Sequence, residues 1–236
     1  MTEIEMVQTG IDGLDKMLGG GFPKGHIALV LGFCGTGKTT FALQFIHEGL
    51  KKGETCAYIS LEENEESLIE TASSYGWDIS RYIDEKKLAV VRLDPGNLKS
   101  AVTSLKRFVP ETLSMLSAQR VAVDPITLFE IMFDDEQNKR NSLFELCSII
   151  KKSGATALFT SETKTDTVTM SRGGLIEYIA DGVILLKYIV PTQTSAVKLA
   201  LRVVKMRRAK HSRKIRPYSI TDNGIAVFSE TELFGE

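Results

Sequence analysis

The stretch LGFCGTGKTTFAL, Leu31–Leu43, decides the fold of this chain. It contains the spacing G-x-x-x-x-G-K-T, formed by Gly32, Gly37, Lys38 and Thr39. Backbone N–H groups of such a loop point inward and cradle phosphate oxygens, while the lysine reaches the β and γ phosphates and the threonine hydroxyl holds Mg²⁺. The stretch therefore predicts a phosphate-binding loop that leads into a helix.

The sequence on either side of this loop favours the same interpretation. Residues 26–32 form a short apolar run typical of a buried strand, and residues 38–53 have helical periodicity that ends at a glycine. The helix begins at the loop, so its positive dipole end also faces a bound phosphate. A glycine-rich turn with a surface lysine is the alternative. We expect nucleotide contacts from Gly32, Cys34, Gly35, Thr36, Gly37, Lys38, Thr39 and Thr40.

The composition is that of an ordinary globular chain. Its 236 residues suffice for one large α/β domain, and 43% are hydrophobic and 25% charged. A net charge of −1 gives no overall preference for nucleic acid or an acidic membrane. We see no apolar run that could cross a bilayer and no signal pattern. We therefore expect no membrane partner. The three cysteines form no C-x-x-C pair, and an odd, scattered set of this kind suits a reducing cytoplasm.

Strand-like and helix-like patterns alternate along the first 180 residues. The alternation predicts a mainly parallel twisted sheet with helices on both faces. Pro110 should kink the longest helical pattern or split it in two. The strand-like runs are 27–31, 56–60, 88–93, 121–124 and 156–160, and the later helical runs are 65–75, 98–116 and 138–152.

After Gly182 the pattern changes to short apolar runs that lie close together. Such runs predict strands that extend the sheet by antiparallel hairpins, with the TDNG sequence at 221–224 as a turn. The runs are 183–188, 198–205, 217–220 and 226–228.

Two strand ends carry carboxylates suited to nucleotide hydrolysis, which needs a held metal ion and a positioned water. The run RVAVD ends in Asp124, the arrangement in which one carboxylate holds Mg²⁺ directly or through a water, together with Thr39. An ordinary turn aspartate before Pro125 is the alternative. Glu62 and Glu63 follow the second strand, where either could act as general base. Acidic residues are also favoured at a helix start by the dipole, so the residues alone leave this role open.

Two further segments could contact a phosphate. Ser161 and Glu162 end another strand, and we expect the Ser161 side chain to contact the γ-phosphate and pass its presence to the polar loop 163–174. A plain surface loop is the alternative. Residues 205–216 are the most basic stretch of the chain, which suits nucleic acid, anionic lipid, a bound phosphate or simply a solvated turn.

The order of these motifs resembles the KaiC-like and RadA-like ATPases of the RecA superfamily. The resemblance covers essentially the whole chain and is greatest to single-domain KaiC-like ATPases common in archaea. It implies that residues 1–236 form one RecA-like P-loop domain of the fold described above. The matching segments are TGIDGLDKMLGGGFPKGHIALVLG at 9–32, YISLEE at 58–63, RVAVD at 120–124, YIADGVILL at 178–186 and KMRRAKHS at 205–212.

The resemblance also implies a function and several roles. It implies Mg²⁺-dependent binding and hydrolysis of ATP in a ring, taken as a hexamer, with a regulatory or signalling task. The pair Glu62 and Glu63 would include the catalytic base. Lys205 and Arg207 would reach the γ-phosphate of the neighbouring subunit, and His211 would lie near that nucleotide. One departure is Pro125, where the family usually has serine.

Two other functions stay open at the level of sequence. One is a recombinase paralogue that binds DNA, although the loop 163–174 has only Lys164 and Arg172 as bases and no aromatic platform for stacking. The other is an autokinase, and a signalling protein is a further possible partner. The candidate phosphate acceptors are Thr165, Thr167, Thr169 and Ser171.

Overall fold

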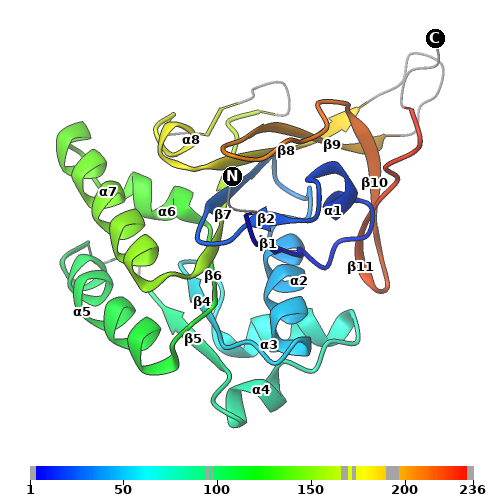
Figure 1. The fold of residues 1–236 in the computed structure, drawn as a ribbon. Helices are drawn as coiled ribbons and strands as arrows, with labels where there is room; N and C mark the ends of the chain where they lie inside the picture. The colour runs from blue at the N-terminus through cyan, green and yellow to red at the C-terminus, as the bar shows by residue number, and fades with distance from the viewer. Residues whose placement is uncertain are drawn as a thin grey trace.

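The computed structural model describes residues 4–93, 96, 98–165, 170–171, 174–189 and 197–232. Within these residues the main sheet has nine strands in the order β11-β10-β9-β8-β3-β7-β6-β4-β5 (Figure 1). The strands from β8 to β5 in this order run parallel, as the alternation of strands and helices predicted. They are β8 (Gly182–Ile189), β3 (Ile27–Gly32), β7 (Thr156–Glu162), β6 (Arg120–Asp124), β4 (Cys56–Ser60) and β5 (Leu88–Arg92).

The last strands extend this sheet with antiparallel pairing beyond β8, as the short apolar runs predicted. The predicted turn at 221–224 joins the last two of them. They are β9 (Lys198–Met206), β10 (Arg216–Thr221) and β11 (Gly224–Val227). A separate two-stranded sheet near the N-terminus, β1 (Met6–Val7) with β2 (Phe22–Pro23), was not predicted.

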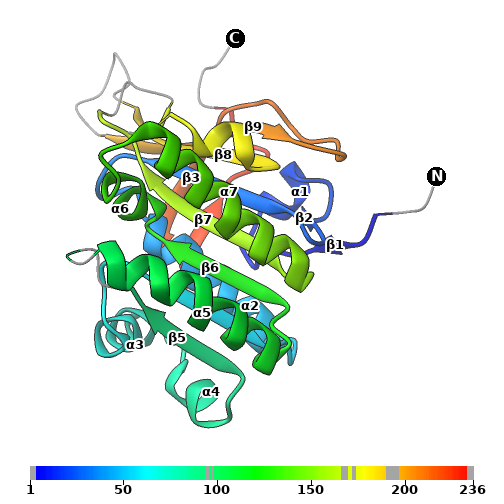
Figure 2. The same ribbon diagram turned by 90° about the vertical axis from the view of Figure 1, so that its left-hand side faces the viewer.

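Helices cover both faces of the sheet (Figures 1 and 2). Each face has its own hydrophobic core, because side chains alternate along every strand: Ala28 and Val30 belong to one core, and Leu29 and Leu31 to the other. The first core is covered by α1 (Leu14–Met17), α2 (Lys38–Lys51), α3 (Glu65–Ser74) and α4 (Ser80–Asp84). The second is covered by α5 (Leu98–Leu116), α6 (Ile126–Ile131), α7 (Glu136–Ser153) and α8 (Ile176–Ile179).

Local sequence signals set the helix boundaries. The side chain of Asn64 accepts a hydrogen bond from the backbone N–H of Ser67 and caps the start of α3. Asp135 caps α7 in the same way through Asn138, and α7 stops at Gly154, whose φ of 79° suits a residue without a side chain. None of the helices in the described part of the chain has the length and apolarity needed to span a bilayer.

Pro110 does not split its helix in two, which was one of the two outcomes that the sequence pattern predicted. Pro110 lies inside the single helix α5. Proline removes one helical hydrogen bond, but the buried side chains of Val109 and Leu113 pack into the second core on either side of it. Their burial holds the segment in one helix, an effect of tertiary packing that the local pattern does not contain.

Candidate nucleotide-binding site

The loop between β3 and α2 is pressed closely against the antiparallel extension of the sheet. Gly35 and Gly37 have φ angles of 75° and 83°, the left-handed region that favours glycine. A Cβ atom on Gly35 would lie 2.6 Å from the hydroxyl of Tyr188 on β8. One on Gly37 would lie 2.7 Å from a terminal carbon of Ile220 on β10. The positive φ favours glycine at both positions, and a side chain at either one would also have to displace the end of the Tyr188 or Ile220 side chain.

Three tyrosine hydroxyls form hydrogen bonds with this loop or with the first turn of α2. Tyr218 on β10 donates to the Thr36 carbonyl oxygen at 2.7 Å, and Tyr188 donates to the Cys34 carbonyl oxygen at 3.1 Å. The hydroxyl of Tyr75, at the end of α3, pairs with that of Thr40 at 3.1 Å. Thr36 is buried and its own hydroxyl donates to the Phe33 carbonyl oxygen, so its side chain supports the loop from behind.

A pocket of about 300 Å³ opens in front of this loop, at the carboxyl ends of the parallel strands. This is the edge at which open α/β sheets bind their ligands. The pocket brings together residues from the loop, the first turn of α2 and the ends of three strands, β4, β6 and β7. They are Cys34, Gly35, Gly37, Lys38, Thr39, Thr40, Glu62, Asp124, Pro125 and Glu162.

Lys38 is the one cation among the described residues that line the pocket. Its amino group donates to the Phe33 carbonyl oxygen at 3.1 Å. Burial lowers the pKa of Lys38, while the nearby carboxylates, Glu162 first and then Asp124, raise it. Several carboxylates thus surround a single ammonium group, and a phosphate that enters here would bring its own negative charge to Lys38.

Asp124 ends β6 and is only 5% exposed. Tyr58 on β4 donates its hydroxyl to Oδ2 of Asp124 at 2.7 Å, and Thr160 on β7 donates to Oδ1. Burial raises the pKa of Tyr58 well above its usual value, so this hydroxyl stays protonated and remains a donor. Together with the Thr39 hydroxyl in the same pocket, Asp124 supplies the hard oxygen ligands that Mg²⁺ prefers.

The structure separates the two glutamates that the sequence left equivalent. Glu62 lines the pocket, and burial raises its pKa, with further increases from the neighbouring Asp124 and Glu162 carboxylates. The Glu63 carboxylate instead accepts a hydrogen bond from the Ser67 hydroxyl at 2.7 Å, in the first turn of α3. Glu62 therefore faces the pocket, whereas the Glu63 side chain is bound to the first turn of α3.

Ser161 lies behind the pocket and does not line it. It is fully buried, and its hydroxyl pairs at 2.9 Å with that of Thr127 on α6. The next residue, Glu162, lines the pocket, and its backbone N–H donates to the same Thr127 oxygen. Successive side chains of a strand point to opposite faces, so strand parity was the signal that could have favoured Glu162 over Ser161.

Lys205, Arg207 and His211 are not brought to the pocket of their own chain. Lys205 pairs with Val183 at the beginning of β8, whereas the phosphate loop adjoins the carboxyl half of that strand. The Lys205 amino group donates to the Glu177 carbonyl oxygen at 2.6 Å. Arg207 donates to the Tyr178 carbonyl oxygen at 2.9 Å. The ring nitrogens of His211 are buried without a hydrogen-bond partner within the described residues.

The structure describes two of the four candidate phosphate acceptors. Thr167 and Thr169, like the basic residue Arg172, fall outside the described residues. Thr165 is exposed, and the hydroxyl of Ser171 donates to the Glu177 carboxylate at 2.9 Å. The autokinase hypothesis stays a prediction.

Comparison with known proteins identifies one family. The family model described as "ATPase: KaiC" matches residues 7–232. The circadian clock oscillator protein KaiC of Prochlorococcus marinus subsp. pastoris is 31% identical over 96% of this chain and 46% of its own length. The KaiC of Synechococcus elongatus is 30% identical over 95% of this chain and 44% of its own length. The chain therefore spans about half the length of these curated relatives.

A solved structure matches over its whole length. The crystal structure of a KaiC-like protein from the hyperthermophilic archaeon Pyrococcus horikoshii superposes with a TM-score of 0.85 and 34% identity, covering 96% of this chain and 100% of that one. The family resemblance and the fold class predicted from the sequence are thereby confirmed.

Proposed function

The chain belongs to the KaiC family of ATPases, and from that premise we propose that it binds and hydrolyses ATP with Mg²⁺ at the carboxyl end of its parallel sheet. The observation that carries the proposal is the pocket in which Lys38, Glu62 and Asp124 converge in front of a glycine-rich loop. These three side chains come from the loop and from the ends of two different strands, so only the folded chain assembles them.

Four side chains in the pocket have distinct roles in this proposal. The loop amides and the Lys38 ammonium bind the β and γ phosphates. The Thr39 hydroxyl and the Asp124 carboxylate hold Mg²⁺, which neutralises charge on the phosphate oxygens when it is bound. Glu62 accepts a proton from the attacking water as general base, and its raised pKa brings it nearer to neutral pH, where a base is most effective.

The pocket is short of positive charge for the reaction it would perform. Negative charge builds on the transferred phosphoryl group, and Lys38 is the one cation among the described lining residues. We propose that a neighbouring subunit in a ring, taken as a hexamer, supplies Lys205 and Arg207, with His211 beside the same nucleotide. Their position away from the chain's own pocket supports this arrangement.

We place the protein in the cytoplasm and assign it a regulatory task, in which slow hydrolysis times a change of state in the ring. The support is its similarity to proteins described as circadian clock oscillator proteins. Those relatives are about twice as long as this chain, so their full activities are not transferred to it.

Two measurements on the same preparation test these proposals separately. Isothermal titration with ATP and Mg²⁺, followed by a phosphate-release assay, is expected to show binding and slow turnover. Light scattering with and without ATP and Mg²⁺ is expected to show a ring. Absence of nucleotide binding would overturn the function, whereas hydrolysis by a monomer would overturn only the shared site.

A further inference from the structure

Asp124 lies between two buried hydroxyl groups, those of Tyr58 and Thr160. Neither the sequence motifs nor the family match gives these two groups a role. Strand β6 lies between β4 and β7 in the sheet. Tyr58 on β4 belongs to the core beneath α2, as do Ala122 and Leu158, two residues before Asp124 and Thr160 respectively. Because side chains alternate along a strand, all three polar groups lie on the face that α2 covers.

Both donors approach the same carboxylate from opposite sides. The Tyr58 hydroxyl donates a hydrogen bond to one oxygen of Asp124 at 2.7 Å, and the Thr160 hydroxyl donates one to the other oxygen. Tyr58 and Thr160 are 1% and 0% exposed, so water does not compete for either bond. With both oxygens engaged by groups on rigid strands, the plane of the carboxylate is fixed.

The two bonds leave the carboxylate able to bind a cation. A carboxylate offers about four lone-pair sites, two on each oxygen, so each oxygen of Asp124 keeps one acceptor site after the hydroxyls have bound. Asp124 also lines the pocket beside Thr39, so part of the carboxylate faces the place where Mg²⁺ would lie. Hydrogen bonds behind a metal ligand orient it and raise its affinity for the metal.

We propose that Tyr58 and Thr160 are positioning residues that hold Asp124 in the orientation required to bind Mg²⁺. This inference rests on the proposed function, since it concerns the metal ligand of the same pocket. A purely structural role, in which the hydroxyls only satisfy a buried carboxylate, predicts lower stability without a selective change in metal affinity. The two roles therefore predict different effects on the affinity for the metal.

The test measures metal binding directly on protein loaded with ADP. Mn²⁺ replaces Mg²⁺ because its electron paramagnetic resonance signal reports the free ion. The Mn²⁺ dissociation constant is expected to rise about tenfold in Tyr58→Phe and in Thr160→Val, the range that loss of a supporting bond typically causes. Thr160→Ser keeps the hydroxyl and is expected to stay close to wild type. ADP affinity without metal should be unchanged in all variants.

The outcomes separate this inference from the function on which it rests. Unchanged Mn²⁺ affinity in both folded hydroxyl-free variants would overturn the positioning role while leaving nucleotide binding intact. Failure of the wild-type protein to bind ADP would instead overturn the proposed function. If Tyr58→Phe does not fold, the Thr160→Val and Thr160→Ser pair decides the matter alone. Tyr82→Phe, which changes a tyrosine stacked under Arg81 on α4, is the control for the substitution itself.

Discussion

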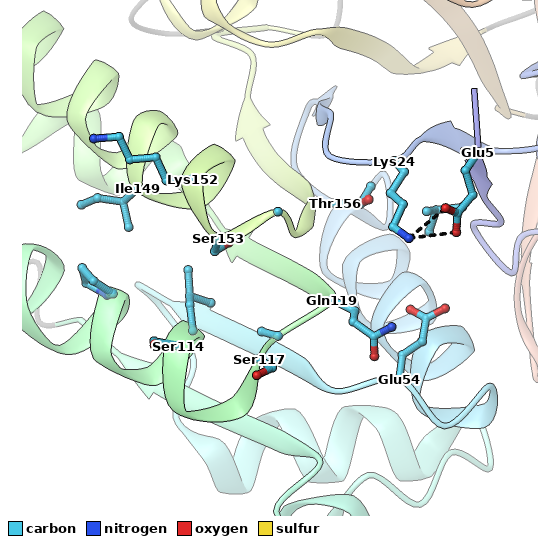
Figure 3. A pocket seen from close by; sticks show the side chains of 15 residues that line it. Glu5, Lys24, Glu54, Ser114, Ser117, Gln119, Ile149, Lys152, Ser153 and Thr156 are labelled. Atoms are coloured by element: carbon cyan, nitrogen blue, oxygen red, sulfur yellow. Dashed lines mark hydrogen bonds and ion pairs between the residues drawn. The ribbon is translucent and has the colours of Figure 1, made fainter. Parts of the chain in front are cut away.

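The two ends of the parallel sheet each carry a pocket, and the larger one is not where the chemistry is expected. The pocket at the carboxyl end measures about 300 Å³. The pocket at the opposite end measures about 600 Å³ and lies between the C-terminal ends of α5 and α7 and the beginnings of β6 and β7 (Figure 3). Between these two pockets, volume alone would choose the wrong one.

Charge pairing distinguishes the two ends. In the larger pocket three of the four charged residues described in its lining have a partner: Lys24 pairs with Glu5 at 2.8 Å, and Glu54 pairs with Arg120 at 2.6 Å, which leaves Lys152 (Figure 3 shows the first pair). In the smaller pocket Lys38 donates to a backbone carbonyl oxygen while several carboxylates face the same space. An end at which most charges are already paired has less to offer a charged ligand, whereas the carboxyl end has a charge arrangement that a phosphate and a cation would complete.

The largest expected effect comes from removing the lysine of the smaller pocket. Lys38→Ala is expected to weaken ATP binding by at least about 100-fold, because the charge-assisted hydrogen bonds of a buried ammonium to phosphate are lost. Isothermal titration measures the change. Lys24→Ala removes one of the two lysines of the larger pocket and is the matched control, with ATP affinity unchanged. Equal affinities in all three proteins would show that the carboxyl end is not the phosphate site.

The second effect separates the two glutamates at the carboxyl end. Glu62→Gln keeps the shape of the side chain but removes the base, which typically costs about 10²–10⁴ in hydrolysis rate. Glu63→Gln alters a residue bound to the Ser67 hydroxyl and is expected to change the rate by less than about tenfold. Single-turnover hydrolysis at saturating ATP measures both. A larger loss in Glu63→Gln than in Glu62→Gln would reverse the assignment.

A third effect concerns stability at the same end of the sheet. Glu130 lies on α6, which begins directly after β6, and both of its carboxylate oxygens are buried without a hydrogen-bond partner among the described residues. Burial, together with the nearby Glu177 carboxylate on α8, raises its pKa to about 7. From α7, Lys139 lowers this pKa and Glu136 raises it.

The sign of the pH dependence follows from this raised pKa. Between about pH 4.5 and 7 the folded state holds a proton that the unfolded state has released, so stability falls as pH rises and levels off above 7. The full change is about 3 kcal/mol. The Glu130→Gln side chain stays neutral at every pH. The gain in free energy of unfolding of this variant over wild type, measured by urea unfolding, should therefore be larger at pH 8 than at pH 5. An equal difference at both pH values would contradict the assignment.

Much of the fold followed from the sequence because it depends on local patterns. The alternation of apolar strands and helical runs, and the glycine spacing at Gly32 and Gly37, are readable without tertiary information. Pro110 shows the limit, since packing holds its helix together against a local signal. The short elements α1, α4, α6 and α8 were also not predicted, because so few residues carry no periodicity.

The sequence could predict the residues of the site that lie at strand ends, but not the residues that bind to them from neighbouring strands. Asp124 and Glu62 end or follow strands in the sequence, and the structure brings both to one pocket. The partners of Asp124 required knowledge of which strands are neighbours, because Tyr58 and Thr160 lie 66 and 36 residues from it. The prediction of Ser161 as a phosphate contact shows the same limit, because a sequence indicates where a strand ends more readily than which face of the sheet each side chain occupies.

The central claim is that the carboxyl end of one subunit and Arg207 of the next form one catalytic site. Lys38→Ala subunits lack a working pocket but keep Arg207, and Arg207→Ala subunits have the reverse defect. An arginine supplied by a partner contributes about 10³–10⁵ in rate in related phosphoryl-transfer enzymes, so each variant alone should be nearly inactive.

The most direct test is the hydrolysis rate of an equal mixture of these two variants, with mixed rings verified by native mass spectrometry. Random assembly places an intact pocket beside an intact arginine at about a quarter of the head-to-tail interfaces. The account therefore predicts recovery of about that share of the wild-type rate. A mixture that forms mixed rings and stays as inactive as its components would contradict it.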